Sequence, residues 1–101
     1  MNINKIKQLS ALEGCLGITL AERGLKLCEE AGELSAAILK RTSCPNASAS
    51  AQDNVAEEAV DTMINCLDIL FALGYEEDGI QALLDLKCKK WEDKMSGFKS
   101  H

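Results

Sequence analysis

Hydrophobic and polar residues alternate along this chain with the periodicity of α-helices. Leu20, Leu27 and Leu34 recur every seven residues, and other apolar residues fall three or four positions away, which places them on one helix face. Leu, Ile and Ala are frequent and aromatic residues make up only 4%, which also favours helices over strands. The pattern predicts an all-α chain with four helices, at residues 3–13, 19–41, 53–74 and 76–95.

Short sequence signals mark three ends in the second and third of these helices. Thr19 and Glu22 have the spacing of a capping box, in which each side chain bonds the backbone N–H of the other residue. Asp53 or Asn54 is expected to cap the third helix, and Gly74 stands where a helix-ending glycine belongs. We therefore expect the chain to turn before residue 19 and at residue 74.

The segment 42–52 is predicted to be a loop, because it contains the single proline, Pro45, among small polar residues. Two interpretations of this loop are open: a lid over a site, or a plain flexible connector. The tail 96–101 is expected to be frayed. The chain then forms a single domain, 1–101, whose helical core covers about residues 20–95.

The third predicted helix differs from the others because its apolar residues occupy more than one face. A polar stripe crosses this surface at spacings of three, four and three, and no lysine or arginine occurs from residue 55 to residue 73. The stripe consists of Glu58, Asp61, Asn65 and Asp68. Such a helix has more apolar surface than one short partner covers. We therefore expect a four-helix bundle completed by oligomerisation, as a homodimer or homotetramer.

Composition argues against several classes of protein. With 101 residues and a net charge of −5, the chain lacks the basic surface that a general nucleic-acid binder needs. Its longest unbroken apolar run, 69–73, is far too short to span a membrane, and the N-terminal segment does not resemble a signal peptide. We expect a cytoplasmic protein that binds neither a nucleic-acid polymer nor a membrane.

The cysteines are widely spaced and form no Cys-x-x-Cys motif. Most of them fall on predicted apolar faces, which is typical of small buried hydrophobic residues in a reducing cytosol. A zinc site or a nucleophilic thiol is the alternative, and the lack of an internal histidine argues against both. The five cysteines are Cys15, Cys28, Cys44, Cys66 and Cys88.

Two short carboxylate clusters lie inside the second and third predicted helices, with the sequences Glu-Glu-Ala-Gly-Glu at 29–33 and Glu-Glu-Ala-Val-Asp at 57–61. Residues three apart share a helix face, so each cluster presents a pair of like charges on one side. If the two helices pack together, the pairs meet and require a compensating cation. Carboxylate oxygens suit Mg²⁺ first and Mn²⁺ as a substitute. The four converging acids would be Glu30, Glu33, Glu58 and Asp61.

Three alternatives to an active metal site are open for these acids. The acids at 29–33 could be surface residues paired with Lys26 and Lys40. The chain could instead be a non-catalytic helical interaction module whose acidic face binds a basic partner, or an inactive nucleotide-binding relative of an enzyme. A di-iron carboxylate bundle is disfavoured, because it requires Glu-x-x-His pairs and the only histidine is His101.

Together the two clusters resemble the motifs of the MazG family of all-α nucleoside triphosphate pyrophosphohydrolases. The match consists of Glu-Glu-x-x-Glu at 29–33 and, after a spacer, Glu-x-x-Asp at 58–61. The basic segment 87–91 also looks like the family, and the resemblance extends over about residues 20–95. It implies a Mg²⁺-dependent enzyme that cleaves a nucleoside triphosphate between its α and β phosphates. The products would be a nucleoside monophosphate and pyrophosphate, in housecleaning of the nucleotide pool.

When the positions of the family's motifs are transferred to this sequence, the resemblance also implies which acids are catalytic. Glu29 is the extra acid of the first motif and points to a different side of the helix from Glu30, so it would orient the attacking water. The implied metal ligands are Glu30, Glu33, Glu58 and Asp61.

Five further residues are candidates for binding the substrate. Lys26, Lys87 and Lys90 could contact phosphates, the last two across a subunit boundary, although solubility and compensation of a helix dipole would explain such lysines as well. Asn65 could hydrogen-bond a base or sugar, or be satisfied structurally. Trp91 could stack on a base, whereas a lone Trp in a helical protein is more often part of the core.

Overall fold

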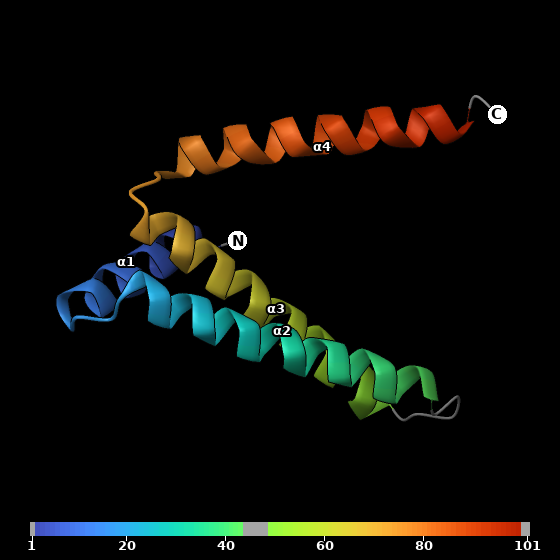
Figure 1. Ribbon diagram of the computed structural model, residues 1–101, viewed down its shortest axis with the longest axis horizontal. Coiled ribbons are helices and arrows are strands. Elements are labelled where there is room, and N and C mark those ends of the chain that lie inside the picture. The colour runs from blue at the N-terminus through green and yellow to red at the C-terminus, as the bar shows by residue number, and fades with distance from the viewer. Residues whose placement is uncertain (1, 44–48, 100–101) are drawn as a thin grey trace.

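The computed structural model describes residues 2–43 and 49–99, and all regular structure within these ranges is α-helical, as predicted. α2 and α3 lie side by side as an antiparallel pair, α1 packs on α3, and α4 projects away from this group (Figure 1). The four helices are α1 (Ile3–Cys15), α2 (Leu20–Ser43), α3 (Ala49–Ala72) and α4 (Glu77–Lys99).

Local side-chain chemistry explains where the helices begin and end. The Asn2 side chain accepts a hydrogen bond from the backbone N–H of Lys5 at 3.2 Å and starts α1. The predicted capping box is confirmed: Thr19 Oγ1 accepts from the Glu22 N–H, and Glu22 Oε1 accepts from the Thr19 N–H, each at 3.1 Å. Gly74 follows α3 with a φ of +93°, a conformation that favours glycine, so its predicted position at a helix end is confirmed too.

The described residues of the predicted loop 42–52 are helical, which corrects the sequence-based expectation for them. α2 continues to Ser43 and α3 begins at Ala49. Residues 49–52 contain neither Gly nor Pro, so nothing in the local sequence prevents the helix from starting there. The rest of the predicted loop, 44–48, lies outside the described residues, and so does the choice between a lid and a connector.

Two predicted helix ends are wrong as well. Asp53 and Asn54 lie inside α3 and not at its cap, because the helix begins before them. α4 extends to Lys99 instead of fraying from residue 96, since no proline interrupts its last turns. The final two residues of the expected tail lie outside the described part.

The core is small and is centred on α3, which packs against both α2 and α1. Ser10 in α1 is buried, and its hydroxyl donates to the backbone carbonyl of Asp68 in α3 at 3.1 Å, which ties these two helices together. α3 is therefore the central helix of this group. Among the described residues, the buried apolar side chains are Ala37, Leu67 and Ile80.

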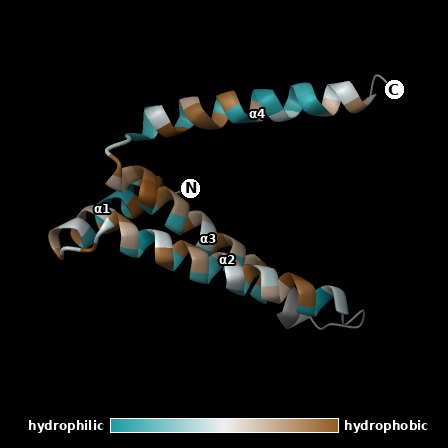
Figure 2. Cartoon of the chain, viewed as in Figure 1, coloured by the Kyte–Doolittle hydropathy of each residue, from teal (hydrophilic) through white to brown (hydrophobic). Residues whose placement is uncertain are grey.

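α4 leaves the rest of the chain after its first turn. Ile80 is only 2% exposed, but beyond it the described α4 side chains are exposed, except that Leu83 is half-buried. Figure 2 shows hydrophobic bands along α4 although no other helix covers them. The radius of gyration is 16.8 Å, whereas a compact chain of this length has about 13 Å. A four-helix bundle therefore does not form within one chain.

The burial predicted for the cysteines is wrong for those that the structure describes. Each of them is exposed, because large parts of every helix surface have no neighbouring helix in this open arrangement. Cys44 lies outside the described residues. The exposed cysteines are Cys15, Cys28, Cys66 and Cys88.

The described helices also differ from membrane-spanning segments. None of them combines the length and apolar character needed to cross a bilayer.

Candidate metal centre

Three carboxylates converge between α2 and α3, and we call this group, Glu30, Glu33 and Glu58, the acidic triad. One carboxylate oxygen of each residue lies within 4.8 Å of the others. Glu30 and Glu33 are about one turn apart on α2, and the packing of α3 alongside brings Glu58 to the same place. The structure thus brings together three of the four acids that the sequence predicts to meet.

Glu30 is the most enclosed member of the acidic triad, with 7% of the residue exposed. Its Oε2 atom is buried without a hydrogen-bond partner among the described residues, and the same holds for Oε2 of Glu58. A buried carboxylate oxygen without a partner is destabilising. A cation from solution would therefore be most stabilising if it bound at these two oxygens.

Burial, together with repulsion from neighbouring acids, raises the pKa of Glu58 above its ordinary value. Burial is the largest cause, the negative charges of Glu33 and Glu30 follow, and a hydrogen bond with Glu33 and the charge of Asp61 add to it. None of these causes lowers the pKa of Glu58, so no positive charge offsets the repulsion there. The electrostatics therefore favour the uptake of a proton or a metal ion here.

Lys26 is the basic side chain that contacts the acidic triad, from one turn earlier on α2. Its Nζ lies 3.2 Å from Glu30 Oε1 and 4.0 Å from Glu29 Oε2, and these acids raise the pKa of Lys26, the hydrogen bond to Glu30 most. The Lys26 side chain is 54% exposed, so water screens the pair. The alternative of surface residues paired with lysine fits Glu29, whose side chain is 59% exposed. It does not fit Glu30, which is buried.

Asp61 and Asn65 lie farther along the same side of α3 as Glu58. Asp61 is exposed in a shallow depression that it shares with Glu57 and Val60, and its carboxylate is not among the three that converge. The Asn65 side chain is half-buried, and its Nδ2 donates to the backbone carbonyl of Asp61 at 3.0 Å. The amide of Asn65 is therefore engaged by its own helix.

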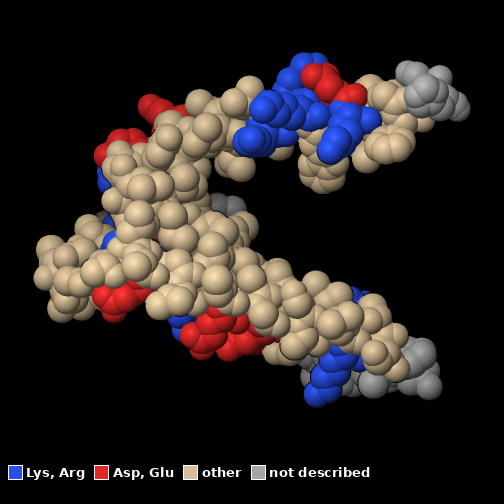
Figure 3. Space-filling model, in the orientation of Figure 1, with Lys and Arg blue, Asp and Glu red and all other residues tan. Residues whose placement is uncertain are grey.

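The candidate substrate-binding residues of the last helix do not reach the acidic triad within one chain. Lys87, Lys90 and Trp91 lie on the exposed part of α4, and Figure 3 shows its basic side chains well apart from the acidic patch over α2 and α3. Trp91 is 66% exposed, so it is not a core residue of the single chain.

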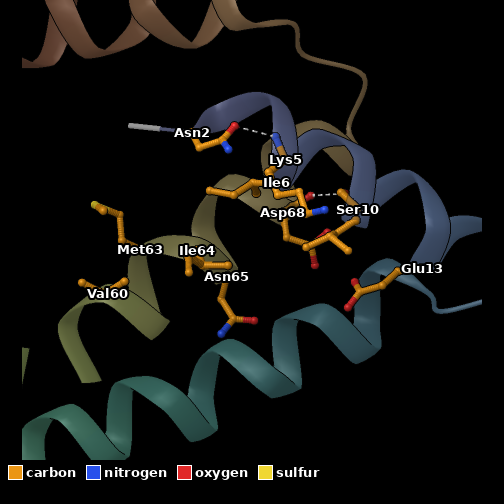
Figure 4. Close-up of a pocket in the computed structure, with 11 residues that line it drawn as sticks. Asn2, Lys5, Ile6, Ser10, Glu13, Val60, Met63, Ile64, Asn65 and Asp68 are labelled. Atoms are coloured by element: carbon orange, nitrogen blue, oxygen red, sulfur yellow. Dashed lines mark hydrogen bonds between the residues drawn. The ribbon is translucent and has the colours of Figure 1, made fainter. Parts of the chain in front are cut away.

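A second group of charged residues lies where α1, α2 and α3 meet, and we call it the arginine junction: Arg23, Glu13 and Asp68. The Arg23 Nε lies 3.2 Å from Asp68 Oδ2 and 3.5 Å from Glu13 Oε2. Its Nη2 donates to the Ser10 carbonyl at 3.2 Å, and Arg23 is only 7% exposed. Figure 4 shows Ser10, Glu13 and Asp68 facing one another from α1 and α3.

Sequence reasoning missed the arginine junction, although a signal was present. Arg23 shares the core-facing stripe of α2 with Leu27, Glu30 and Leu34, at spacings of four, three and four. A basic residue on such a stripe needs a buried acidic partner, and Asp68 is the member of the α3 stripe that provides it.

Similarity to known proteins does not identify the site. No protein-family model, no curated protein and no solved structure matches this chain, so its functional assignment rests on the residues and geometry described above.

Proposed function

We propose that this protein is a Mg²⁺-dependent nucleoside triphosphate pyrophosphohydrolase of the MazG type, acting in housecleaning of the nucleotide pool. The observation that carries the proposal is the acidic triad, in which carboxylates of two helices meet within 4.8 Å and leave buried oxygens without partners. The motifs at 29–33 and 58–61 supply the reaction class by resemblance. Hydrolysis at the α–β phosphoanhydride would yield a nucleoside monophosphate and pyrophosphate.

The donor set fits a hard divalent cation. Glu30, Glu33 and Glu58 offer only oxygen ligands, and Asp61, about one turn from Glu58, is the fourth. Mg²⁺ held by these residues, or Mn²⁺ in its place, would offset the charge of the triphosphate and of the leaving pyrophosphate and lower the pKa of a bound water. Oxygen-only ligands also make zinc and copper poorer candidates.

The residues around the acidic triad have separate tasks in this proposal. Glu29 is exposed beside Glu30 and would orient the attacking water and accept its proton. Lys26, already paired with Glu30, carries a positive charge that can turn to a phosphate oxygen. These two residues thus lie on the solvent side of the buried Glu30, where a substrate would arrive.

The nucleoside end of the substrate requires residues beyond the acidic triad. Asn65 would hydrogen-bond the base or sugar once its amide leaves the Asp61 carbonyl. Lys87 and Lys90 would contact phosphates, and Trp91 would stack on the base with the ring face that the contact between two chains leaves open. Because α4 stands apart in one chain, we assign these three to a second copy. The active species would then be a homodimer or homotetramer.

The direct test is a panel of nucleoside and deoxynucleoside triphosphates, incubated with the protein and Mg²⁺ and assayed for pyrophosphate. We expect pyrophosphate and the monophosphate in equal amounts, with no orthophosphate, and loss of the activity with chelator. If the protein binds Mg²⁺ but releases no pyrophosphate from any of these nucleotides, the assignment as an enzyme is wrong. The alternative of a non-catalytic interaction module would then be favoured.

Single substitutions identify the residues responsible. Glu33→Gln and Asp61→Asn should each lower turnover at least about 100-fold, because each removes a charged metal ligand. Glu57→Gln is the matched control: it makes the same chemical change on an exposed residue of α3 outside the acidic triad, and it should leave turnover unchanged. Circular dichroism should show equal helicity in all variants. Full activity in both Glu33→Gln and Asp61→Asn would contradict the metal assignment.

A further inference from the structure

We propose that α4 is an exchanged arm: the α4 helix of one chain packs into a groove between α1 and α3 of a second copy, and the second copy does the same in return. This proposal concerns assembly and does not depend on the chemistry of the acidic triad.

The arm carries an apolar stripe that no described part of its own chain covers. Leu84, Trp91, Met95 and Phe98 follow one another at spacings of seven, four and three, which places them on one face of α4. They are 52%, 66%, 46% and 71% exposed, respectively. A monomeric protein rarely leaves a continuous row of large apolar side chains in water.

The exposed area of the whole chain indicates that a large interface is missing. The chain exposes 7553 Å², whereas a compact monomer of this mass exposes about 5,600 Å². The excess of about 2,000 Å² per chain is of the size that an obligate dimer buries. A small ligand or a weak transient contact would cover much less.

A groove of matching character lies between α1 and α3 and has a volume of about 460 Å³. Its apolar lining includes Ile6 and Leu9 from α1 and Val60, Met63 and Ile64 from α3. Figure 4 shows this groove with α4 of the same chain passing at a distance from it. Ile80 is buried at the base of α4, but no residue of α4 lines this groove, so the groove stays open within one chain.

Charge complementarity supports a second copy as the occupant of the groove. Lys87, Lys90 and Lys94 line one border of the apolar stripe of α4, at spacings of three and four. In the groove, Lys5 is basic, and Glu13 and Asp68 are already paired with Arg23. The acidic border is formed by Glu57 and Asp61, in the depression that adjoins the groove through Val60. The arm thus presents apolar residues with a basic border to an apolar groove with an acidic border.

The shape of the chain fits reciprocal exchange. In Figure 3, α4 and the α2–α3 pair form two limbs with open space between them. Two such chains related by a twofold axis can each place an arm between the limbs of the other. Such an isologous contact buries the arm of each copy in the same way.

The test uses the whole 101-residue chain and its single tryptophan, which lies on the arm. Sedimentation or light scattering at micromolar concentration should give the mass of two chains, or of four. Trp91 emission should lie at the short wavelength of a buried indole and shift to longer wavelength on dilution, together with the fall in mass. Either a monomer, or an oligomer with solvent-exposed Trp91, would overturn the proposal.

Two matched pairs of variants locate the contact. Leu84→Glu on the arm and Met63→Glu in the groove should each weaken association about 100-fold or more, because each places a charge in an apolar contact. Their controls add the same charge elsewhere: Ala82→Glu on the opposite side of α4, and Leu25→Glu on α2 outside the groove. Both controls should keep the wild-type mass.

The decisive readout is Trp91 in the Met63→Glu variant. Met63 is on α3, so a shift of Trp91 emission to longer wavelength with unchanged helicity means that the groove of one chain receives the arm of another. If this variant stays oligomeric with buried Trp91, the arm packs elsewhere, for instance on a second arm, and the proposal is wrong. Copurification of a different protein or a small apolar ligand in the groove of a monomer would also overturn it.

Discussion

The arginine junction and the acidic triad both bring carboxylates together, but only the first receives its cation from the chain. At the junction, the buried Arg23 lies within 3.5 Å of both acids and also bonds a backbone carbonyl. At the acidic triad, the nearest cation is Lys26, more than half exposed, which contacts Glu30 alone among the three acids. The comparison separates a structural cluster from one that is prepared to bind something.

The two clusters also differ in their buried oxygens that lack a hydrogen-bond partner. The acidic triad leaves one buried oxygen each on Glu30 and Glu58 without a partner, whereas at the junction this applies only to Asp68 Oδ1. Where an arginine can form two or more bonds, burial of the acids is compensated within the fold. Where it cannot, the repulsion persists until an ion or a proton arrives. Three experiments, in order of expected effect, test this contrast.

Removal of Arg23 should have the largest effect, and only on stability. Arg23→Met leaves Glu13 and Asp68 unpaired at the meeting point of three helices. The free energy of unfolding should fall by about 3 kcal/mol, as expected when one partner of a buried ion pair is lost. Urea unfolding at fixed protein concentration measures this, since association also contributes to stability. Saturating Mg²⁺ should not restore the loss.

Arg41→Met is the matched control for this experiment, because Arg41 is an exposed arginine in the last turn of the same helix. It should change the free energy of unfolding by no more than about 0.5 kcal/mol. If the two variants are equally stable, the arginine junction contributes nothing to the fold and the contrast between the clusters is lost.

Addition of Mg²⁺ should have the next largest effect, and it should act through the acidic triad. At ten times its dissociation constant, an ion that binds only the folded state adds about 1.4 kcal/mol. Glu58→Gln should abolish this gain. It should also raise the melting temperature in chelator, because it removes one of the mutually repelling charges.

Thermal unfolding with and without Mg²⁺ measures both changes, and Glu57→Gln, which alters the preceding residue, should retain the wild-type response. A protein that Mg²⁺ does not stabilise, or a Glu58→Gln variant that responds like wild type, would show that the acidic triad is not a metal site.

The sequence predicted the elements of this fold better than their arrangement. Helical periodicity, the capping box at Thr19 and the glycine at 74 are local signals, and the structure confirms them. The helix start at Ala49 was missed because a weak capping signal at Asp53 was preferred over a run without helix breakers. The position of α4 was also missed, because no periodicity tells whether an apolar face meets its own chain or another.

In the candidate site, too, the sequence predicts some features and only the packing of the helices determines the others. Spacing places Glu30 and Glu33 on one face of α2 and Glu58 and Asp61 on one face of α3. Only the packing of the two helices shows that Glu58 joins the first pair and that the Asp61 carboxylate does not. The burial of Glu30 and the exposure of Glu29 depend on how α2 is rotated against α3, which spacing does not determine. Arg23 pairs with Asp68, 45 positions later, and with Glu13, 10 positions earlier. Spacing along one helix does not predict such contacts between helices, and only the packed structure shows them.

The smallest effect should come from the acid of the arginine junction that remains half-exposed, Glu13. Burial raises its pKa above 4.5, and the hydrogen bond and charge of Asp68 raise it further, against the lowering effect of Arg23. A carboxyl group with a raised pKa in the folded state contributes stability that is fully present below its unfolded pKa and is lost as the pH rises through the folded pKa.

In wild type, the contribution of Glu13 to stability should therefore decline as the pH rises from about 4 through the range just above its ordinary pKa. Glu13→Gln does not titrate, so the free energy of unfolding of wild type minus that of the variant should decrease across this range and then become constant. Urea unfolding of both proteins between about pH 4 and pH 7 measures this difference. Because the Glu13 side chain is 42% exposed, water screens its interactions and the change should be small. A difference that grows with pH would mean that Arg23 outweighs Asp68 at Glu13, and the junction would then hold both of its acids ionised.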